Sequence, residues 1–187
     1  MTRKKTKASS DAETNEATAT DQPTRTFRIG THEIDARPVT PGLYLVSTPI
    51  GNLGDMTIRG LETLAGANII ACEDTRVSRV LLDRFGITTR PYAYHEHNAE
   101  RVGPKLMEAL EAGKSVALIS DAGTPLISDP GYRLSQTAIE AGVAVIPIPG
   151  ASAPMAALVA SCLPDFCHPR TRRGATGWQV SPRQRRR

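Results

Sequence analysis

Residues 118–131, LISDAGTPLISDPG, decide how the chain folds. The segment begins as the end of an apolar run, SVALIS, and then changes to Ser, Asp, Gly and Pro. It is too long for a hairpin turn, and its apolar centre, PLI, is unusual for a loop exposed to solvent. We interpret it as the carboxyl end of a buried strand that continues as a wall of a ligand site, with Asp129 at the start of the next helix.

Short apolar runs alternate with helical patterns on both sides of this segment. Runs typical of buried strands cover residues 43–48, 68–72, 115–120 and 143–148. Helical spacing covers residues 55–67, 76–86, 100–114, 131–142 and 151–161. In the third of these helices, Gly103 and Pro104 mark the expected start. The alternation predicts an α/β fold with an open, parallel-type sheet flanked by helices on both faces.

Four polar turns follow the predicted strands, at residues 48–55, 73–76, 120–131 and 147–153. Ligands of open parallel sheets bind at the carboxyl ends of the strands, so these turns are expected to form one ligand edge. The first turn lacks the G-x-G-x-x-G spacing of nicotinamide sites, and the last two contain no lysine of a P-loop. The pattern favours a zwitterionic ligand with a flat apolar part over a polyphosphate.

The turn Glu73-Asp74-Thr75-Arg76 places two carboxylates and a guanidinium at the end of a strand. Two interpretations remain open: a site cluster, or a surface cluster that satisfies itself while Thr75 caps the next helix.

The sequence YHEHN at residues 94–98 places His95 and His97 on either side of Glu96. This is not the helical H-E-x-x-H spacing of zinc enzymes, so no metal site is predicted, and a position that touches substrate is expected instead.

Composition divides the chain into three parts. Residues 1–37, expected to be disordered or extended, hold seven Lys/Arg and six Asp/Glu. The predicted domain covers residues 38–161, and residues 38–167 hold nine Lys/Arg against thirteen Asp/Glu. Residues 162–187 form an irregular Arg- and Pro-rich tail; residues 168–187 contain seven Arg and no acid. The basic pI therefore reflects the tail, whereas the expected folded part is acidic.

Apolar runs stay far below the roughly 20 residues of a membrane span, so no membrane partner is expected. The three cysteines show neither zinc spacing nor an even count, which favours a reducing, cytoplasmic location.

Three segments together resemble a known family. Residues 42–82 (GLYLVSTPIGNLGDMTIRGLETLAGANIIACEDTRVSRVLL), 118–134 (LISDAGTPLISDPGYRL) and 145–158 (VIPIPGASAPMAAL) are similar to the N-terminal domain of the ribosomal RNA small subunit methyltransferase I family. This family is a branch of the tetrapyrrole-methylase superfamily. The resemblance implies methyl transfer from S-adenosylmethionine to the ribose 2′-oxygen of a cytidine in 16S rRNA of the small ribosomal subunit. It also suggests a homodimer.

The resemblance carries site residues with it. The implied contacts with S-adenosylmethionine are Leu53, Ala122, Gly123, Thr124, Ile127, Ser152 and Ala153. The candidates for the group that accepts the proton of the 2′-hydroxyl are Asp74, Glu73 and His95. Arg76, His97 and Asn98 are the expected contacts with RNA, Arg76 through a bidentate pair with a phosphate.

Two departures leave alternatives open. Porphyrin-modifying relatives carry Gly-Asp-Pro where this chain has Gly123-Thr124-Pro125, which argues against a tetrapyrrole substrate. After residue 161 the family continues into a second α/β domain, whereas this sequence becomes Arg-rich. We therefore expect a truncated or frameshifted copy that lacks the second domain and exposes apolar surface. The alternative function is a non-catalytic fragment, or an RNA-binding module that uses the Arg-rich tail.

Overall fold

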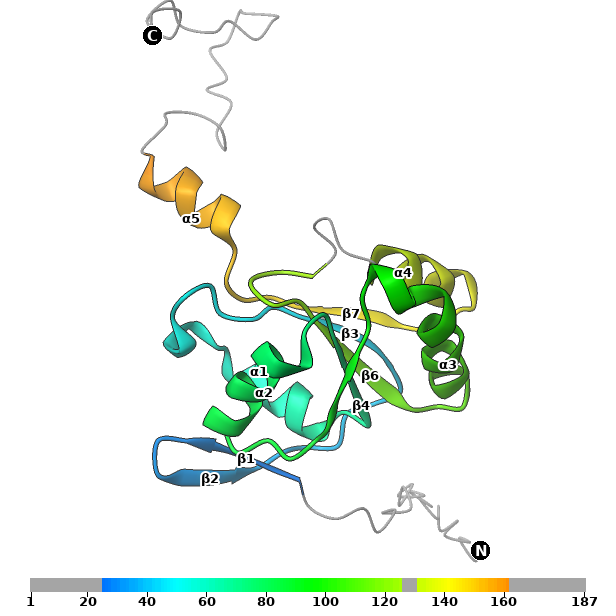
Figure 1. Ribbon diagram of the computed structural model, residues 1–187. Coiled ribbons are helices and arrows are strands. Elements are labelled where there is room, and N and C mark those ends of the chain that lie inside the picture. Colours follow the sequence, from blue (N-terminus) through cyan, green and yellow to red (C-terminus); the bar gives the residue numbers. More distant parts are fainter. Residues whose placement is uncertain (1–24, 126–130, 162–187) are drawn as a thin grey trace, which may run out of the picture.

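A five-stranded parallel sheet forms the centre of the protein (Figure 1). The structure, a computed structural model, describes residues 25–125 and 131–161. The strand order is β5-β4-β6-β3-β7, and every neighbouring pair is parallel. The strands are β3 (Gly42–Val46), β4 (Ile69–Cys72), β5 (Pro91–Ala93), β6 (Ser115–Ile119) and β7 (Val145–Ile148). The predicted α/β fold with a parallel sheet is confirmed.

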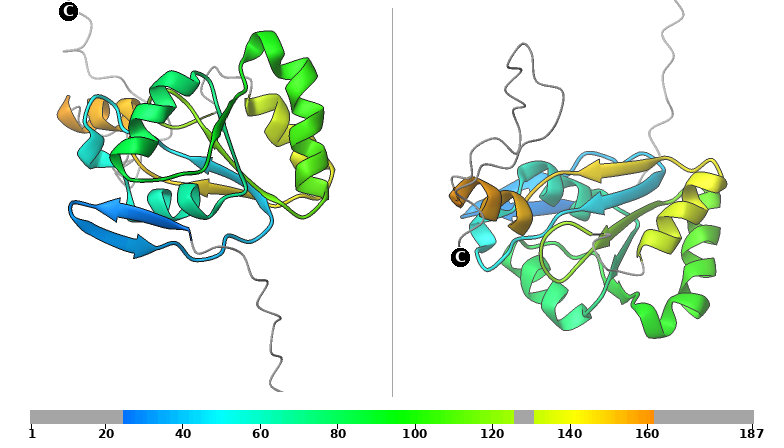
Figure 2. Two further views of the ribbon diagram at one scale, coloured as in Figure 1. Left: turned by 60° about the horizontal axis from the view of Figure 1, so that its bottom comes forward. Right: turned by 90° about the horizontal axis from the view of Figure 1, so that it is seen from above.

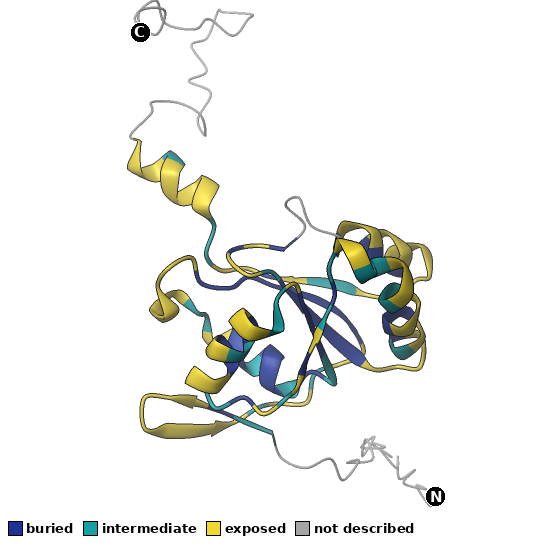
Figure 3. Cartoon of the chain, in the orientation of Figure 1, coloured by how far each residue is buried: buried dark blue, intermediate teal, exposed yellow. Residues whose placement is uncertain are grey.

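Helices cover the two faces of the sheet and create two apolar clusters. On one face, α1 (Ile58–Gly66) and α2 (Thr75–Arg84) pack on strand residues such as Val46. On the other face, α3 (Ala99–Glu111) and α4 (Gly131–Glu140) pack on residues such as Leu45. Side chains of a strand alternate between faces, so strands buried on both sides must be apolar throughout. All five residues of β3 and of β6 are buried for this reason (Figure 3).

The strand β5 was missed by the sequence prediction. It has only three residues, which are too few to show the alternation of apolar and polar residues that marks a strand. It pairs with β4, where Ala71 lies opposite Tyr92 and Cys72 opposite Ala93. The sheet therefore ends in a short edge strand that leaves part of β4 uncovered.

An antiparallel hairpin of β1 (Thr26–Ile29) and β2 (His32–Asp35) precedes the sheet (Figure 2). It lies in residues 1–37, which were expected to be disordered or extended. The side chain of Phe27 is buried in the cluster formed by α1 and α2, and the Arg28 N–H donates to the Phe85 carbonyl at 2.6 Å. One buried aromatic side chain thus attaches the hairpin to the domain.

Two predicted helix starts differ from the structure. Helix α1 begins at Ile58 because Thr57 is its N-cap and accepts from the Gly60 N–H at 3.1 Å; Asp55 instead lies in a short 3₁₀ helix, Leu53–Asp55. Helix α3 begins at Ala99, so the expected start at Gly103 and Pro104 was wrong. Pro104 has no N–H, so the helix loses one backbone hydrogen bond there. The packing of α3 on the sheet keeps the helix continuous across this residue.

Helix α5 (Ala153–Ala160) extends from the sheet edge and buries none of its residues in the described structure (Figure 1). It exposes the apolar side chains of Met155 and Val159.

In the part of the chain that the structure describes, every helix is too short or too polar to cross a lipid bilayer.

Leu64→Ala should lower the free energy of unfolding by about 3 kcal/mol, because a fully buried leucine leaves a cavity when truncated. Leu64 is 0% exposed in the α1 face of the core. Ile58→Ala on the same helix, where the side chain is 64% exposed, should change stability by less than about 0.5 kcal/mol. Urea unfolding followed by circular dichroism measures both. Equal losses would contradict the assignment of α1 to the core.

Candidate functional site

The predicted turns meet at one edge of the sheet. Because the strands are parallel, the ends of β3, β4, β6 and β7 all release the chain on the same side. The described parts of the four turns, residues 48–55, 73–76, 120–125 and 147–153, form what we call the ligand edge. Residues 126–130, including the predicted cofactor contact Ile127, lie outside the described residues.

The first and third turns are joined by a backbone bridge. Thr48 and Gly123 exchange two hydrogen bonds, with N–H to carbonyl distances of 2.9 and 3.0 Å. The Thr48 hydroxyl also donates to the Ser120 carbonyl at 3.0 Å. Gly123 has a φ of +83°, and a Cβ there would lie 3.2 Å from Cδ1 of Ile50. Both the backbone conformation and the close approach therefore favour glycine.

The fourth turn is joined to the first and third. The Thr124 hydroxyl donates to the Ala151 carbonyl at 3.3 Å and lies 3.1 Å from the Ser47 hydroxyl. The Ser47 N–H donates to the Ile148 carbonyl at 3.2 Å. A Cβ on Gly150 would lie 2.9 Å from Cβ of Ser47, so the fourth turn lies against the residue that directly precedes the first turn.

The second turn is joined to the third through a carboxylate. Oδ1 of Asp121 accepts from the Asp74 N–H at 3.1 Å. Hydrogen bonds therefore connect all four turns into one continuous edge.

A cavity of about 260 Å³ opens between the first turn, α2 and the end of β6. Its lining combines apolar side chains with the hydroxyls of Thr48 and Ser120 and the carboxylate of Asp121. The lining residues are Thr48, Pro49, Leu53, Val77, Ser78, Val80, Leu81, Ile119, Ser120 and Asp121. Among the predicted cofactor contacts that the structure describes, only Leu53 lines this cavity.

Sequence reasoning missed the contribution of α2 to the cavity. Val77 and Val80 are exposed large apolar side chains, whereas the core face of this helix carries Leu81 and Leu82. A second apolar stripe on an otherwise polar helix was the signal that could have identified this wall.

Asp74 and Arg76 form a closed pair. The two Asp74 oxygens accept from Nε of Arg76, each at 3.2 Å, and Oδ2 also accepts from a terminal nitrogen at 2.7 Å. Oδ1 accepts from the Arg76 N–H at 2.8 Å as the N-cap of α2. These side-chain bonds, and then the backbone bond, lower the pKa of Asp74 to about 2. Asp74, and not Thr75, caps the helix, and Arg76 is occupied by its neighbour.

The pKa of the Cys72 thiol reflects both its burial and the charge at this edge. Burial raises the pKa of Cys72, a hydrogen bond with Ser78 opposes the shift, and the carboxylates of Asp121 and Asp74 raise it further. The strand end therefore lies in a negative field, and the thiol stays protonated at neutral pH. Glu73, exposed next to it, adds a third carboxylate to the same turn.

The turn after β5 holds the two histidines beside the second turn. The Tyr94 N–H donates to the Cys72 carbonyl at 2.7 Å, which joins the turn to the end of β4. The amide of Asn98 donates to the Ala93 carbonyl and accepts from the His95 N–H, both at 3.0 Å. Asn98 thus positions this turn. The rings of His95 and His97 lie 6.0 Å apart, and Nδ1 of His95 is buried without a hydrogen-bond partner in the described structure.

The remaining predicted contacts lie on the open side of the ligand edge. Ala122, Thr124 and Ala153 are exposed, and Ser152 is half-buried. Among residues 25–125 and 131–161, no three His, Cys, Asp or Glu side chains converge in a group that could hold a metal ion.

Comparison with known proteins agrees with this architecture. A crystal structure of a conserved hypothetical protein from Aeropyrum pernix K1 matches with a TM-score of 0.56 and 24% sequence identity, over 68% of this chain and 45% of that one. At this identity the match supports the fold alone.

Sequence relatives are much closer. The chain is 70% identical over 137 residues to a protein of Mesorhizobium japonicum named ribosomal RNA small subunit methyltransferase I, covering 73% of this chain and 47% of that protein. It is 57% identical over 122 residues to a protein of the same name from Halalkalibacterium halodurans, covering 65% and 42%. The chain thus spans about half the length of the curated relatives it matches.

The family model described as tetrapyrrole (corrin/porphyrin) methylases matches residues 42–171. This range includes the whole five-stranded sheet and all four turns of the ligand edge. The chain belongs to the tetrapyrrole methylase family.

Proposed function

We propose that this chain supplies the cofactor-binding domain of an S-adenosylmethionine-dependent methyltransferase. Its substrate is the ribose 2′-oxygen of a cytidine in 16S rRNA of the small ribosomal subunit, and it acts in the cytoplasm. The observation that carries the proposal is the connected ligand edge in a chain 70% identical to a protein named for methylation of small-subunit rRNA. A homodimer is part of the proposal, and the exposed apolar side chains of α5 are the surface that favours it.

The residues at the ligand edge fit S-adenosylmethionine in charge and polarity. The bound cofactor supplies a methyl group on a positively charged sulfur. Burial raises the pKa of the Cys72 thiol, and the carboxylates of Asp121 and Asp74 raise it further. The negative charge of these carboxylates would attract a sulfonium and an ammonium group. Leu53 and Val77 in the cavity provide apolar contact for a flat ring.

The size of the cavity limits what it can hold. Its volume of about 260 Å³ lies below the range of ligand pockets, which span roughly 300–1,000 Å³. We propose that it takes one part of the cofactor, and that the remainder lies across the exposed Ala122 and Ser152–Ala153 segment. Gly123 itself is buried and bonded to Thr48 on both sides, so it holds the exposed Ala122 and Thr124 in place beside such a ligand.

The residues beside the second turn would assist the ribose hydroxyl. A general base is most effective when its pKa lies near the working pH. With a pKa of about 2 and a closed pair with Arg76, Asp74 is a better orienting group than a proton acceptor. Glu73, which forms no ion pair with the described residues, and His95 are the groups that could accept the proton. Proximity then supplies much of the acceleration.

Gly123→Ala should weaken binding of S-adenosylmethionine at least tenfold, because the added Cβ strains a positive φ and presses on Ile50 where the first and third turns meet. Gly142→Ala is the matched control: its φ of +74° carries the same strain, but nothing lies within 4 Å of the added Cβ. Calorimetry with S-adenosylmethionine measures both variants and the unmodified chain. Absence of binding to the unmodified chain at millimolar cofactor would refute the proposed function for this chain.

Arg76→Ala should raise the pKa of Asp74 from about 2 toward its ordinary value of 3.8. In the unmodified chain the pair stabilises the fold above the unfolded pKa of Asp74, and this contribution is lost as the pH falls toward 2. Titration of the carboxyl carbon by NMR measures the shift. Arg79→Ala, which removes a guanidinium paired with Asp83 on the same helix, should leave the Asp74 titration unchanged.

Methyl transfer is measured with labelled S-adenosylmethionine and small ribosomal subunits, followed by digestion of the rRNA to nucleosides. A labelled 2′-O-methylcytidine is expected. Cofactor binding without this product, together with RNA affinity that disappears when residues 168–187 are deleted, would favour an RNA-binding module instead.

A further inference from the structure

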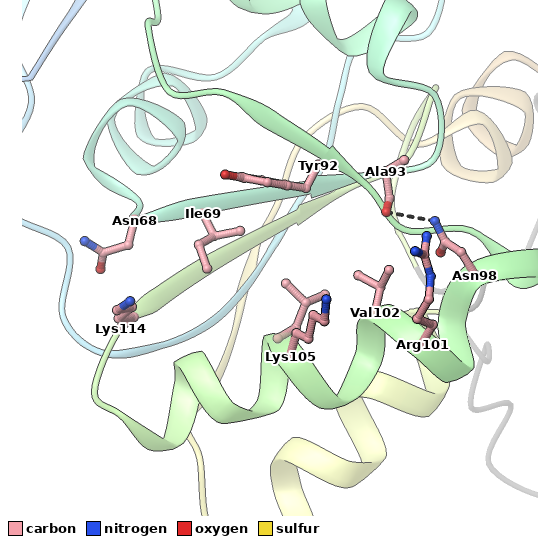
Figure 4. Close-up of a pocket in the computed structure, with 10 residues that line it drawn as sticks. Asn68, Ile69, Tyr92, Ala93, Asn98, Arg101, Val102, Lys105 and Lys114 are labelled. Carbon is pink, nitrogen blue, oxygen red and sulfur yellow. Dashed lines mark hydrogen bonds between the residues drawn. The ribbon is translucent and has the colours of Figure 1, made fainter.

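A second and larger cavity lies away from the ligand-edge cavity, between α3 and the edge of the sheet formed by β4 and β5 (Figure 4). Its volume is about 710 Å³. Asn68 and Lys114 line it where β4 and β6 begin, and Asn98 lines it beyond the end of β5. The cavity therefore runs along the strands as a groove, which we call the basic groove, and it reaches the turn that carries His95.

Cationic side chains from two elements converge on the groove. Arg101 and Lys105 project from α3, and Lys114 precedes β6. All three are exposed, no acidic residue lines the groove, and none of the three forms an ion pair with a described carboxylate. Residues 38–167 hold only nine Lys/Arg against thirteen Asp/Glu, so this part of the chain has a net negative charge. Three cations in one groove therefore form a local positive patch on a negatively charged domain.

The opposite wall of the groove presents an aromatic ring. Tyr92 belongs to the edge strand β5 and is 55% exposed, with its ring directed along the groove (Figure 4). Ile69 and Val102 extend the apolar surface beside it. Grooves that bind single-stranded nucleic acid combine a row of cations for the backbone with exposed aromatic rings on which bases stack.

The spacing of the cations suits an extended strand. Arg101 and Lys105 are four residues apart on α3, so they lie on the same face, separated by about 6 Å along the helix axis. Lys114 continues the row toward the start of β6. Such a row can contact successive phosphates, while Tyr92 faces the bases from the other wall.

We propose that the basic groove binds a single-stranded segment of the substrate RNA, with phosphates on Arg101, Lys105 and Lys114 and a base stacked on Tyr92. Identifying the RNA as the methylation substrate rests on the proposed function. The position of the groove supports this link: the turn at its end also holds His95, and Cys72, opposite Ala93, directly precedes Glu73. A strand leaving the groove there arrives beside the second turn of the ligand edge.

Fluorescence anisotropy of the full chain with a labelled, unstructured 12-nucleotide RNA tests the proposal. The double variant Arg101→Ala/Lys105→Ala should bind about tenfold more weakly near physiological salt. The slope of log affinity against log salt should fall by about 1.4, because each lost phosphate contact on a single strand contributes about 0.7. The double variant Arg28→Ala/Arg84→Ala is the control: it removes the same charge from exposed positions outside the groove and should keep the slope of the unmodified chain.

The aromatic wall is tested separately. Tyr92→Ala should weaken RNA binding about tenfold, whereas Tyr92→Phe keeps the ring and should bind like the unmodified chain. Circular dichroism establishes that each variant folds. An unchanged salt slope in Arg101→Ala/Lys105→Ala would overturn the proposal. Competition with poly-glutamate gives a second test. If poly-glutamate binds the groove as tightly as RNA, and Tyr92→Ala does not change its affinity, the proposal is also overturned, since the groove would then be a site for acidic protein.

Calorimetry with S-adenosylmethionine on the same groove variants separates this proposal from the proposed function. The cofactor affinity should not change, because no groove residue lines the ligand-edge cavity. If the cofactor binds but RNA affinity ignores the groove, only the RNA proposal fails. If RNA affinity depends on the groove while the unmodified chain binds no cofactor, the proposed function fails and the groove remains an RNA site.

Discussion

The burial of β3 between two parallel neighbours is the constraint on which the rest of the structure depends. β3 pairs with β6 on one side and with β7 on the other, and its five residues are all buried. Parallel pairing brings the carboxyl ends of these strands to one edge, and burial on both faces makes a change of register costly. The polar turns that follow the strands are consequently neighbours in space, although the first and fourth are about a hundred residues apart in sequence.

The contacts between these turns leave little freedom at the ligand edge. The Thr48–Gly123 bridge, the bond from Thr124 to Ala151 and the bond from the Asp74 N–H to Asp121 connect all four. A site that transfers a methyl group in line needs such preorganisation, because proximity and orientation provide much of the rate. Asp74 joins these contacts and also pairs with Arg76. In the proposed mechanism Asp74 therefore orients the site, while another group accepts the proton.

Charge is divided between two surfaces of one small domain. The ligand edge carries the carboxylates of Glu73, Asp74 and Asp121, whereas the basic groove carries cations without acidic partners in the described structure. A cationic methyl donor would meet negative charge at the ligand edge, and a polyanionic substrate would meet positive charge in the basic groove. The turn at residues 94–98 lies between the two surfaces. Under the two proposals, this division would let a domain of net negative charge bind an RNA substrate.

Hydrophobic patterning by itself predicted the four longer strands of the five-stranded sheet, the helices α1 to α4 and the common edge of the turns. Burial on both faces leaves unbroken apolar runs in the strands, and packing on one face leaves a 3.6-residue period in these helices. The sequence motifs also indicated the family. Only the tertiary structure decided which groups meet. β5 was too short to show a period, and Pro104 suggested a boundary that packing overrides. The partners of Arg76 and Asp121, the contribution of Val77 to the cavity and the convergence of Arg101 with Lys114 arise from contacts between elements distant in sequence or from side-chain rotamers. A one-dimensional pattern contains neither kind of information.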